Sequence, residues 1–597
     1  MAKKKIGAGK IGCIVVVLVF LILTIGVYRL FTAQKSLPET FVLKIDVSGD
    51  IRETAESGFS FPFEPESREL SLQDIIFLLD RAGDDERVRS VLLDISGLRT
   101  GSAKIQQLQR AVEWTRKTGK PVHAFLRNAG DQDVWLASAC DTVIAERGNF
   151  LLLDGLKAEL LFFTGTLEKL GISFQAAQWS AWKSGVEPFT RLGASPEYKE
   201  QIDMILDGVY AAYTGYVTAQ REIPMETYEN IINKKTVLSA DEAMKLKVVD
   251  EVSGHWEYLE RVKKSFIQEK DNQEDDDVLV SGARYKAAVP WPYEPETKES
   301  IAVITASGPI IRSADDMTAR AEDQGFDEET LRSSVQVALD DESVKAIVLR
   351  IDSPGGDALA SANMLQILDS AKVKKPIVAS MSSVAASGGY MIALAADSIF
   401  AEPLTVTGSI GVYALKPEIS KLQEKINLNR EVLTRGDNAD GFTVFKPLGE
   451  VGMAKFMETT GWIYNDFVAK VARSRKMKPE AVEAVAGGRV WIGELAMKNG
   501  LVDRIGGLED ALQAAQFMAG MDSSAVPGLK FYPEPQGLME YLLGGGPGLS
   551  SRLFGRNLPP GSLADRSIQT LDLLMQLEQQ PGGMYRMTML PFDLRME

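Results

Sequence analysis

In the stretch Ala346-Ile-Val-Leu-Arg-Ile-Asp-Ser-Pro-Gly-Gly356, an apolar β-branched run passes directly into a turn. Apolar runs of this length predict buried strands. A helical pattern follows over residues 359–371, and a second apolar run over residues 377–381 predicts the next strand. The alternation continues with a helical stretch over residues 390–396 and a strand over residues 398–401. Strands that alternate with helices in this way predict an α/β fold with parallel packing.

The same plan occurs twice in the chain. Ser90-Val-Leu-Leu-Asp-Ile-Ser96 resembles the first part of that stretch, and Gly119-Lys-Pro-Val-His123 matches Lys374-Lys-Pro-Ile-Val378. Near the ends of the repeats, residues 238–250 match residues 491–503. The spacing stays at roughly 250 to 260 residues, which is too long for a solenoid unit. The sequence therefore predicts a tandem duplication of an α/β domain.

Composition excludes several classes of protein. The 597 residues carry a net charge of -16, whereas a nucleic-acid-binding surface needs basic side chains to neutralise phosphates. Two cysteines, Cys13 and Cys140, are too few for a disulfide framework. The sequence has no cluster of histidine and cysteine that predicts a metal site, and no dinucleotide or Walker loop. We therefore expect no metal, no cofactor and no nucleic-acid partner.

Residues 11–31 predict a membrane anchor in the lipid bilayer. Residues 11–28 carry no charge, and with Leu30 and Phe31 the stretch reaches about twenty residues, enough for a helix to cross a bilayer. The four lysines before it predict a cytoplasmic N-terminus and an exported remainder. A cleaved signal peptide is the alternative, but residues 30–35 offer no small-x-small cleavage site.

The anchor, the repeats and the composition divide the chain into five parts. An acidic run at 268–277 and a proline-rich run at 290–295 separate the repeats, and a region rich in glycine and proline follows the second one. The predicted parts are the N-terminus with the anchor (1–40), a first α/β domain (41–265), a linker (266–300), a second α/β domain (301–520) and a C-terminal extension (521–597).

Three serines of the second half are candidate nucleophiles: Ser353, Ser387 and Ser409. Ser387 lies between a predicted strand and a predicted helix, and the small residues around it permit a sharp turn that exposes the hydroxyl. The N–H groups at the start of that helix, beginning with Gly388, would face a developing oxyanion. A helix cap without a catalytic role is an equally good interpretation of Ser387 from the local sequence.

A serine nucleophile needs a base, and neither of the two histidines, His123 and His255, lies in a motif that looks catalytic. A lysine base is a known variant of the serine-protease triad. Gly355 and Gly356 could offer backbone N–H groups to a carbonyl oxygen, although Pro-Gly-Gly alone is more often an ordinary tight turn. Their place one strand-helix-strand unit before Ser387 favours the catalytic interpretation.

Four motifs occur in order in the second half: Asp352-Ser-Pro-Gly-Gly356, Ala386-Ser-Gly-Gly-Tyr390, Thr407-Gly-Ser-Ile-Gly411 and Gly500-Leu-Val-Asp503. Together they resemble the signal peptide peptidase A family of membrane-bound serine proteases. The anchor and the duplication are similar to the long, tandem form of that family, and the resemblance covers about residues 41–520. It implies two domains like those of the Clp protease and crotonase superfamily, and a Ser-Lys dyad.

The resemblance places the two parts of the dyad in different halves. The family string Lys-Ser-x-Val-Glu-Pro-Phe is matched by Lys183-Ser-Gly-Val-Glu-Pro-Phe189, which implies Lys183 as the general base and Ser387 as the nucleophile. Ser184 would help to orient the ammonium, and desolvation by neighbouring aromatic side chains would lower the pKa of Lys183. The repeat register sets Asp131 opposite Ser387 and Ala439 opposite Lys183. Each half is therefore expected to supply one part of a single composite site.

The resemblance also implies a substrate, a location and an assembly. It implies an endopeptidase that degrades cleaved signal peptides, anchored in the bacterial cytoplasmic membrane by a single span, with a periplasmic catalytic body and a homo-oligomeric, tetrameric assembly. Two other classes stay open. An acyl-CoA enzyme on the crotonase fold fits poorly with an exported body, and a catalytically degenerate membrane scaffold would be favoured if Lys183 lay far from Ser387.

Overall fold

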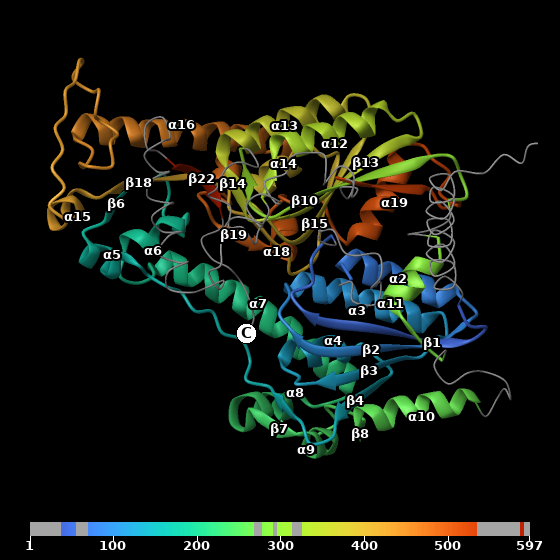
Figure 1. Ribbon diagram of the computed structural model, residues 1–597. Helices are drawn as coiled ribbons and strands as arrows, with labels where there is room; N and C mark the ends of the chain where they lie inside the picture. The colour runs from blue at the N-terminus through green and yellow to red at the C-terminus, as the bar shows by residue number, and fades with distance from the viewer. Residues whose placement is uncertain are drawn as a thin grey trace, which may run out of the picture.

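The computed structural model describes residues 37–54, 70–267, 278–290, 295–312, 325–533 and 585–589. The predicted anchor of residues 11–31 lies outside these ranges. Within the ranges, no helix has both the length and the apolar character that a membrane crossing requires. Figure 1 shows the first half, in blue to green, lying against the second half, in yellow to red, with α2 (Leu72–Asp84) and α3 (Ser102–Lys117) between the two large sheets.

The first half is built on a six-stranded sheet in the order β8-β4-β3-β2-β1-β9, and every neighbouring pair is parallel. Most residues of the central strands β1 and β2 are buried, because helices cover both faces of the sheet. The Ser71 side chain and Asp74 form a capping box that starts α2. The strands are β1 (Phe41–Gly49), β2 (Val88–Leu98), β3 (Val122–Arg127), β4 (Thr142–Glu146), β8 (Glu251–Ser253) and β9 (Leu279–Ser281).

The second half repeats this sheet strand for strand. The order β20-β16-β15-β13-β10-β21 matches the order of the first half, and β17 and β19 extend it beyond β15. The predicted strand–helix alternation and the duplication are thereby confirmed. The strands are β10 (Ser300–Ser307), β13 (Val344–Ser353), β15 (Ile377–Ala386), β16 (Ser398–Ala401), β17 (Val406–Gly408), β19 (Val490–Ile492), β20 (Arg504–Ile505) and β21 (Gly528–Tyr532).

Both sheets end in a strand that lies beyond the predicted domain boundary. Strand β9, which pairs with β1, comes from the stretch 266–300 that the sequence predicts as a linker. Strand β21, which pairs with β10, comes from the predicted extension 521–597. The acidic and proline-rich composition around these two short strands hides their apolar residues, so composition places both boundaries too early.

Helices cover the remaining faces of the two sheets. Tyr258 and Leu259 of α10 (His255–Ile267) pack on the first sheet, and α19 (Leu508–Met518) packs on the second. The other helices are α4 (Asp131–Ala137), α5 (Thr164–Leu170), α6 (Glu187–Thr190), α7 (Pro196–Arg221), α8 (Met225–Asn230), α9 (Ala240–Lys245), α11 (Gly282–Ala288), α12 (Glu328–Asp340), α13 (Ala358–Lys372), α14 (Gly388–Ala393), α15 (Ser420–Lys425), α16 (Glu450–Arg475), α17 (Pro479–Glu483) and α18 (Gly493–Lys498).

The two halves share a core and a set of buried charges. One apolar cluster joins most of the first half to residues of the second, including Ala386 and Val490. Arg350 Nε donates to Glu53 at 2.9 Å, and both side chains are fully buried. Lys104 Nζ pairs with Asp352 at 2.9 Å across the same interface. Buried charges are costly unless paired, so these contacts fix how the halves meet.

A third sheet joins the two halves at the edge where the site lies. Its order is β12-β11-β14-β22-β18-β6, in which only β6 comes from the first half. Figure 1 shows β6 and β18 side by side beneath α16. The strands are β6 (Ser173–Gln178), β11 (Ile310–Ile311), β12 (Phe326–Asp327), β14 (Gly355–Asp357), β18 (Tyr413–Glu418) and β22 (Tyr585–Met589), and a separate two-stranded sheet holds β5 (Phe150–Leu152) and β7 (Val237–Ser239).

Candidate active site

Ser387 occupies a strained turn between β15 and α14. Its φ is 57° and its ψ is -114°, a conformation that residues with a side chain rarely adopt. Gly389 has no room for a side chain, because a Cβ there would lie 2.7 Å from the carbonyl oxygen of Ser353. The Ser387 hydroxyl makes no capping hydrogen bond to α14. The structure therefore does not support the helix-cap interpretation, and strain of this kind often marks functional sites.

The carboxyl ends of three adjacent parallel strands bring the polar groups together. Strands β13, β15 and β17 are neighbours in the sheet, and the residues at or just after their ends are Gly355, Ser387 and Ser409. The Ser387 N–H donates to Gly408 O at 2.8 Å, which ties the end of β15 to the end of β17. Ser409 also has a positive φ, of 48°. Ligands of parallel α/β sheets bind at this edge.

Lys183 reaches these groups from the first half. Strand β6 runs antiparallel to β18, with Gln178 opposite Tyr413, and the chain then continues to Lys183. Lys183 Nζ donates to Ser387 Oγ at 2.7 Å. It also donates to Ser409 Oγ at 2.9 Å and to Ser409 O at 3.0 Å. The sheet between the halves thus places an amine at two hydroxyls of the other half.

Burial controls the charge of this amine. Lys183 is 0% exposed, and its hydrogen bonds go to uncharged oxygens. Burial therefore holds the pKa of the Lys183 ammonium well below its usual value of 10.5. The stem packs against glycines: a Cβ on Gly488 would lie 2.5 Å from Lys183 Cβ, and one on Gly411 would lie 3.2 Å from Lys183 Cδ. Close backbone packing therefore contributes to the desolvation of this side chain.

The remaining predicted site residues lie around this centre with different contacts. The Ser184 hydroxyl donates to Trp182 O at 3.2 Å and accepts from Gln201, so the second hydroxyl at the Lys183 amine belongs to Ser409 and not to Ser184. Gly388 begins α14 directly after Ser387. Gly355 and Gly356 form the first two residues of β14, and the Gly355 N–H donates to Ser353 Oγ at 3.2 Å.

The corresponding place in the first half holds a carboxylate. Helix α4 begins at Asp131, whose carboxylate accepts from the Tyr213 hydroxyl at 2.6 Å and from the N–H of Asp154 at 3.1 Å. Burial raises the pKa of Asp131 to about 6. Ala439 of the second half lies in an exposed loop. Within the described residues, the Lys183–Ser387 arrangement therefore has no counterpart at the equivalent positions.

Neither histidine lies at the Lys183–Ser387 centre. His255 begins α10 and its Nε2 lies 3.2 Å from the Asp94 carboxylate, and His123 belongs to β3, so both histidines lie in the first half. Across the described ranges, no group of three or more histidine, cysteine, aspartate or glutamate side chains is arranged to hold a metal ion.

Sequence reasoning missed the residues that lock the two halves together at Lys183. Gln201 Nε2 donates to Trp182 O at 2.9 Å, and its Oε1 accepts from the Val490 N–H at 3.0 Å. The guanidinium of Arg489 lies over the rings of Trp182 and Trp491. The contacts Gln201–Val490 and Trp182–Arg489 join segments about 300 positions apart, and no local motif predicts them.

Comparisons with known proteins find relatives of this chain among peptidases. The chain matches the model for peptidase family S49 over residues 115–267 and 369–522. It is 31% identical over 484 residues to "Serine protease SPPA, chloroplastic" of Arabidopsis thaliana, covering 81% of this chain and 69% of that one. It is 29% identical over 461 residues to "Protease 4" of Haemophilus influenzae, covering 75% of this chain and 73% of that one. Among solved structures, a ClpP1 variant from Listeria monocytogenes is similar with a TM-score of 0.24 and 14% identity, over 35% of this chain and 94% of that chain.

Proposed function

The chain belongs to peptidase family S49, and on that premise we propose that it is a serine endopeptidase in which Ser387 is the nucleophile and Lys183 the general base. The observation that carries the proposal is the 2.7 Å contact between Lys183 Nζ and Ser387 Oγ, made by a fully buried lysine. A base must be neutral to accept a proton, and burial favours the neutral amine. The short distance also argues against a degenerate scaffold.

Ser409 would orient the lone pair of the base. A neutral amine has two N–H donors and one lone pair. The carbonyl and hydroxyl oxygens of Ser409 accept the two N–H groups, which leaves the lone pair of Lys183 facing the Ser387 hydroxyl. The Ser387 oxygen then attacks the scissile carbonyl carbon while its proton passes to Nζ. The resulting ammonium returns that proton to the leaving amine, and a water molecule hydrolyses the acyl-enzyme by the same route.

The oxyanion would be held by backbone N–H groups on both sides of Ser387. Gly388 would supply one N–H group from the start of α14, and Gly355 and Gly356 would supply N–H groups from the opposite side. The N–H of Gly355 is engaged with Ser353 Oγ at 3.2 Å, a long hydrogen bond that a negatively charged oxygen would replace. Donors fixed in advance around the developing charge are a major source of catalysis.

The substrate would be an extended peptide that adds to strands β14 and β18. The chain's own strand β22 supports this mode, because it pairs antiparallel with both of them. Gly356 lies opposite Thr588 in one pair, and Tyr413 lies opposite Met587 in the other. Strand addition recognises the backbone of a peptide, and pockets for alternate side chains add specificity.

We propose cleaved signal peptides as the substrates and the membrane as the location. The four sequence motifs and the uncharged stretch of residues 11–31 support both. In this arrangement the anchor holds the catalytic body on the periplasmic side of the cytoplasmic membrane. A reporter enzyme that is active only after export, fused at Glu597, should be active, and one that requires the cytoplasm should be inactive. The opposite pair of results would contradict the location.

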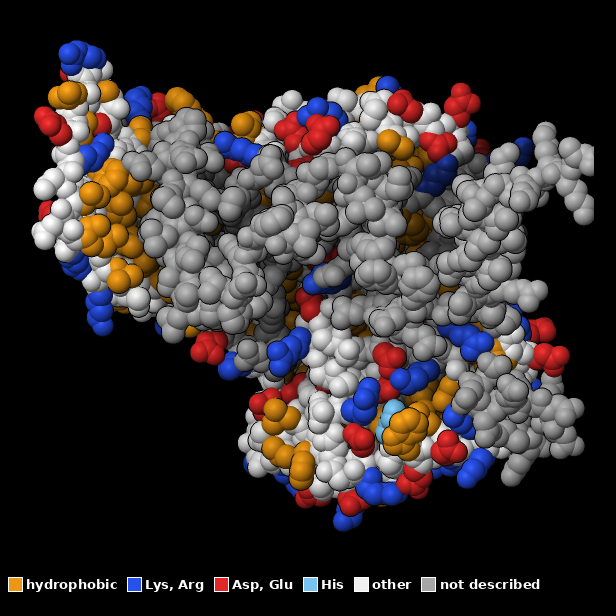
Figure 2. All heavy atoms as spheres, in the orientation of Figure 1, with side chains coloured by type: hydrophobic (Ala, Val, Ile, Leu, Met, Phe, Trp, Pro, Cys, Tyr) orange, Lys and Arg blue, Asp and Glu red, His pale blue; other side chains and the backbone are white. Residues whose placement is uncertain are grey.

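The homo-oligomer is supported by an apolar surface at one end of the molecule. Figure 2 shows hydrophobic side chains gathered where α15 and β6 lie. Leu433, in the loop after α15, is 86% exposed, Ile426 is 62% exposed, and Leu170 of α5 is also exposed. Exposed apolar patches commonly mark protein contacts. Light scattering after size-exclusion chromatography should report a multimer for the native chain and a smaller species for Leu433→Glu; identical masses would argue against this surface.

Covalent labelling tests the proposed function directly. A fluorophosphonate probe reacts with activated serine hydroxyls, so mass spectrometry should locate it on Ser387. Ser387→Ala should abolish the labelling and Lys183→Ala should slow it severely, while circular dichroism of both variants stays native. Rapid labelling of another serine, or of Ser387 in Lys183→Ala, would refute the assignment.

A further inference from the structure

Residues 486–491 of the second half pack directly on the backbone that carries Lys183. A Cβ on Gly488 would lie 2.5 to 2.7 Å from the nitrogen, Cα and Cβ of Lys183. The Ser180 hydroxyl donates to the Gly487 carbonyl from the other direction. Because no side chain fits at Gly488, the backbone of this loop lies directly against the backbone of Lys183. The position of the loop therefore determines the position of the lysine.

Arg489 connects this loop to the lysine's neighbourhood on two sides. Its guanidinium carbon lies 4.3 Å from the centre of the Trp182 ring and 4.6 Å from that of Trp491. Trp182 directly precedes Lys183 in the chain. The Arg489 carbonyl accepts from the Ser409 N–H at 2.8 Å. Arg489 therefore contacts both Trp182, which precedes Lys183, and Ser409, which accepts hydrogen bonds from the Lys183 amine.

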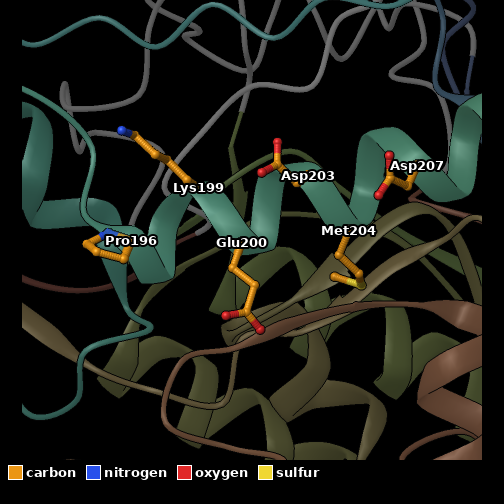
Figure 3. Close-up of a pocket in the computed structure, with 6 residues that line it drawn as sticks. All are labelled: Pro196, Lys199, Glu200, Asp203, Met204 and Asp207. Atoms are coloured by element: carbon orange, nitrogen blue, oxygen red, sulfur yellow. The ribbon is translucent and has the colours of Figure 1, made fainter.

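Glu200 of α7 holds the guanidinium from the first half. The Arg489 Nη2 lies 2.8 Å from Glu200 Oε1. Figure 3 shows Glu200 pointing from α7 toward the strands of the second half, whereas Lys199 points to the opposite side. Glu200 borders an open pocket lined by Pro196, Lys199, Glu200, Asp203, Met204 and Asp207. The Arg489 side chain is 27% exposed, whereas Lys183 is 0% exposed.

We propose that Arg489 is a positioning residue for the Ser-Lys centre. Stacked between Trp182 and Trp491, its flat guanidinium fixes the lysine of one half against the serines of the other and keeps water from the amine. Arginine suits this role because a planar cation can stack on two indole faces and still pair with a carboxylate, which a lysine ammonium cannot do. The inference rests on the proposed function. It adds a residue of the second half, Arg489, that holds the base of the first half, Lys183, in position.

The test compares Arg489→Lys with a matched arginine elsewhere. Arg261 of α10 also combines an aromatic face, that of Tyr258 at 5.3 Å, with a carboxylate, that of Glu251, and it lies on the first sheet away from the site. Turnover of a quenched fluorescent peptide is measured from pH 6 to pH 10, together with the melting temperature. We expect Arg489→Lys to lower kcat about 10-fold, with KM within about twofold, because the stacking is lost while the charge stays.

The pH profile separates positioning from a general structural role. Water admitted beside Lys183 would restore part of its hydration, so the rise of kcat with pH should move to higher pH in Arg489→Lys and stay in place in Arg261→Lys. A normal kcat, or a lowered kcat with an unmoved profile, would overturn the proposal. Trp491→Phe, which shrinks one of the two stacking faces, should show the same displacement if Arg489→Lys does not fold. Should Lys183→Ala remain active, the proposed function itself fails, which is a different outcome.

Discussion

Lys183 and Ser387 lie 204 positions apart in the chain, yet the Nζ of one is 2.7 Å from the Oγ of the other. The contact exists because β6 of the first half joins the sheet of β14 and β18 in the second. Each half therefore carries one part of the centre, and at the equivalent places the first half has Asp131 and the second half has an exposed loop at Ala439. A composite centre of this kind makes the two residues interdependent.

Interdependence predicts non-additive kinetics. Lys183→Ala and Ser387→Ala should each lower kcat by about 10³-fold or more, and the double variant should be no worse than either single one, because the two groups act as a unit. Steady-state hydrolysis of a peptide substrate measures all three. Near-normal turnover of Lys183→Ala, or losses that multiply in the double variant, would show that the residues act separately.

The low pKa of Lys183 predicts how activity depends on pH. A lysine that acts as a general base must be neutral, and burial holds the pKa of the Lys183 ammonium well below 10.5. The kcat/KM should therefore rise with pH through that lowered pKa and level off before pH 10.5. A profile that keeps rising up to the ordinary pKa of lysine would mean that the amine is hydrated in the working enzyme.

The same burial predicts a gain in stability when the amine is removed. Between the lowered pKa of the folded state and the ordinary value of 10.5, the unfolded chain binds a proton that the folded chain does not. The free energy of unfolding should therefore rise with pH across that window. Lys183→Met should be more stable than the native chain at neutral pH, and its advantage should shrink toward pH 10.5. Urea titrations at pH 7 and pH 10 measure the difference; an advantage independent of pH would contradict it.

Ser409 should contribute to rate without being essential. Its hydroxyl is one of the acceptors at the Lys183 amine, at 2.9 Å, and its carbonyl at 3.0 Å remains after substitution. Loss of one hydrogen bond of this kind costs about 1.5 kcal/mol or somewhat more. Ser409→Ala should therefore lower kcat by about 10- to 100-fold and leave KM nearly unchanged. Complete inactivity would point to Ser409 as a participant in the chemistry.

The sequence predicts well what is local or repeated. The apolar run at 346–351 lies within β13, and the turn that carries Ser387 lies where the pattern changes from strand to helix. The repeat is visible because equivalent strands need the same buried residues in both halves. Lys183 came from resemblance to a family string, since nothing in its local sequence distinguishes it from a surface lysine.

What the sequence does not predict depends on pairing across the halves. Ser184 is expected to orient the amine because it is adjacent to Lys183, but the second hydroxyl at the amine, beside that of Ser387, belongs to Ser409, 226 positions away. The pair Arg350–Glu53 and the stacking of Arg489 likewise arise only when the two sheets meet. Strands β9 and β21 were missed because they are short and are surrounded by acidic or proline-rich residues.

Strand β22 makes a specific prediction about substrate access. Residues Tyr585–Met589 pair with β14 and with β18, the two strands between which the peptide would bind. A segment of the same chain competes at a high effective concentration, so it should weaken binding of an added peptide. A chain that ends at residue 584 should therefore show a KM about 10-fold lower for an extended peptide, with kcat little changed.

A chain that ends at residue 589 is the matched control, because it loses the following residues and keeps β22. Thr588→Pro is a second variant: it removes the backbone N–H at the position opposite Gly356, which should weaken the pairing without shortening the chain. The chain ending at 584 should lower KM more than Thr588→Pro does. The chain ending at 589 should have the same KM as the full chain. An unchanged KM in the chain ending at 584 would mean that peptides bind elsewhere, and a loss of kcat would mean that β22 completes the sheet instead of competing for it.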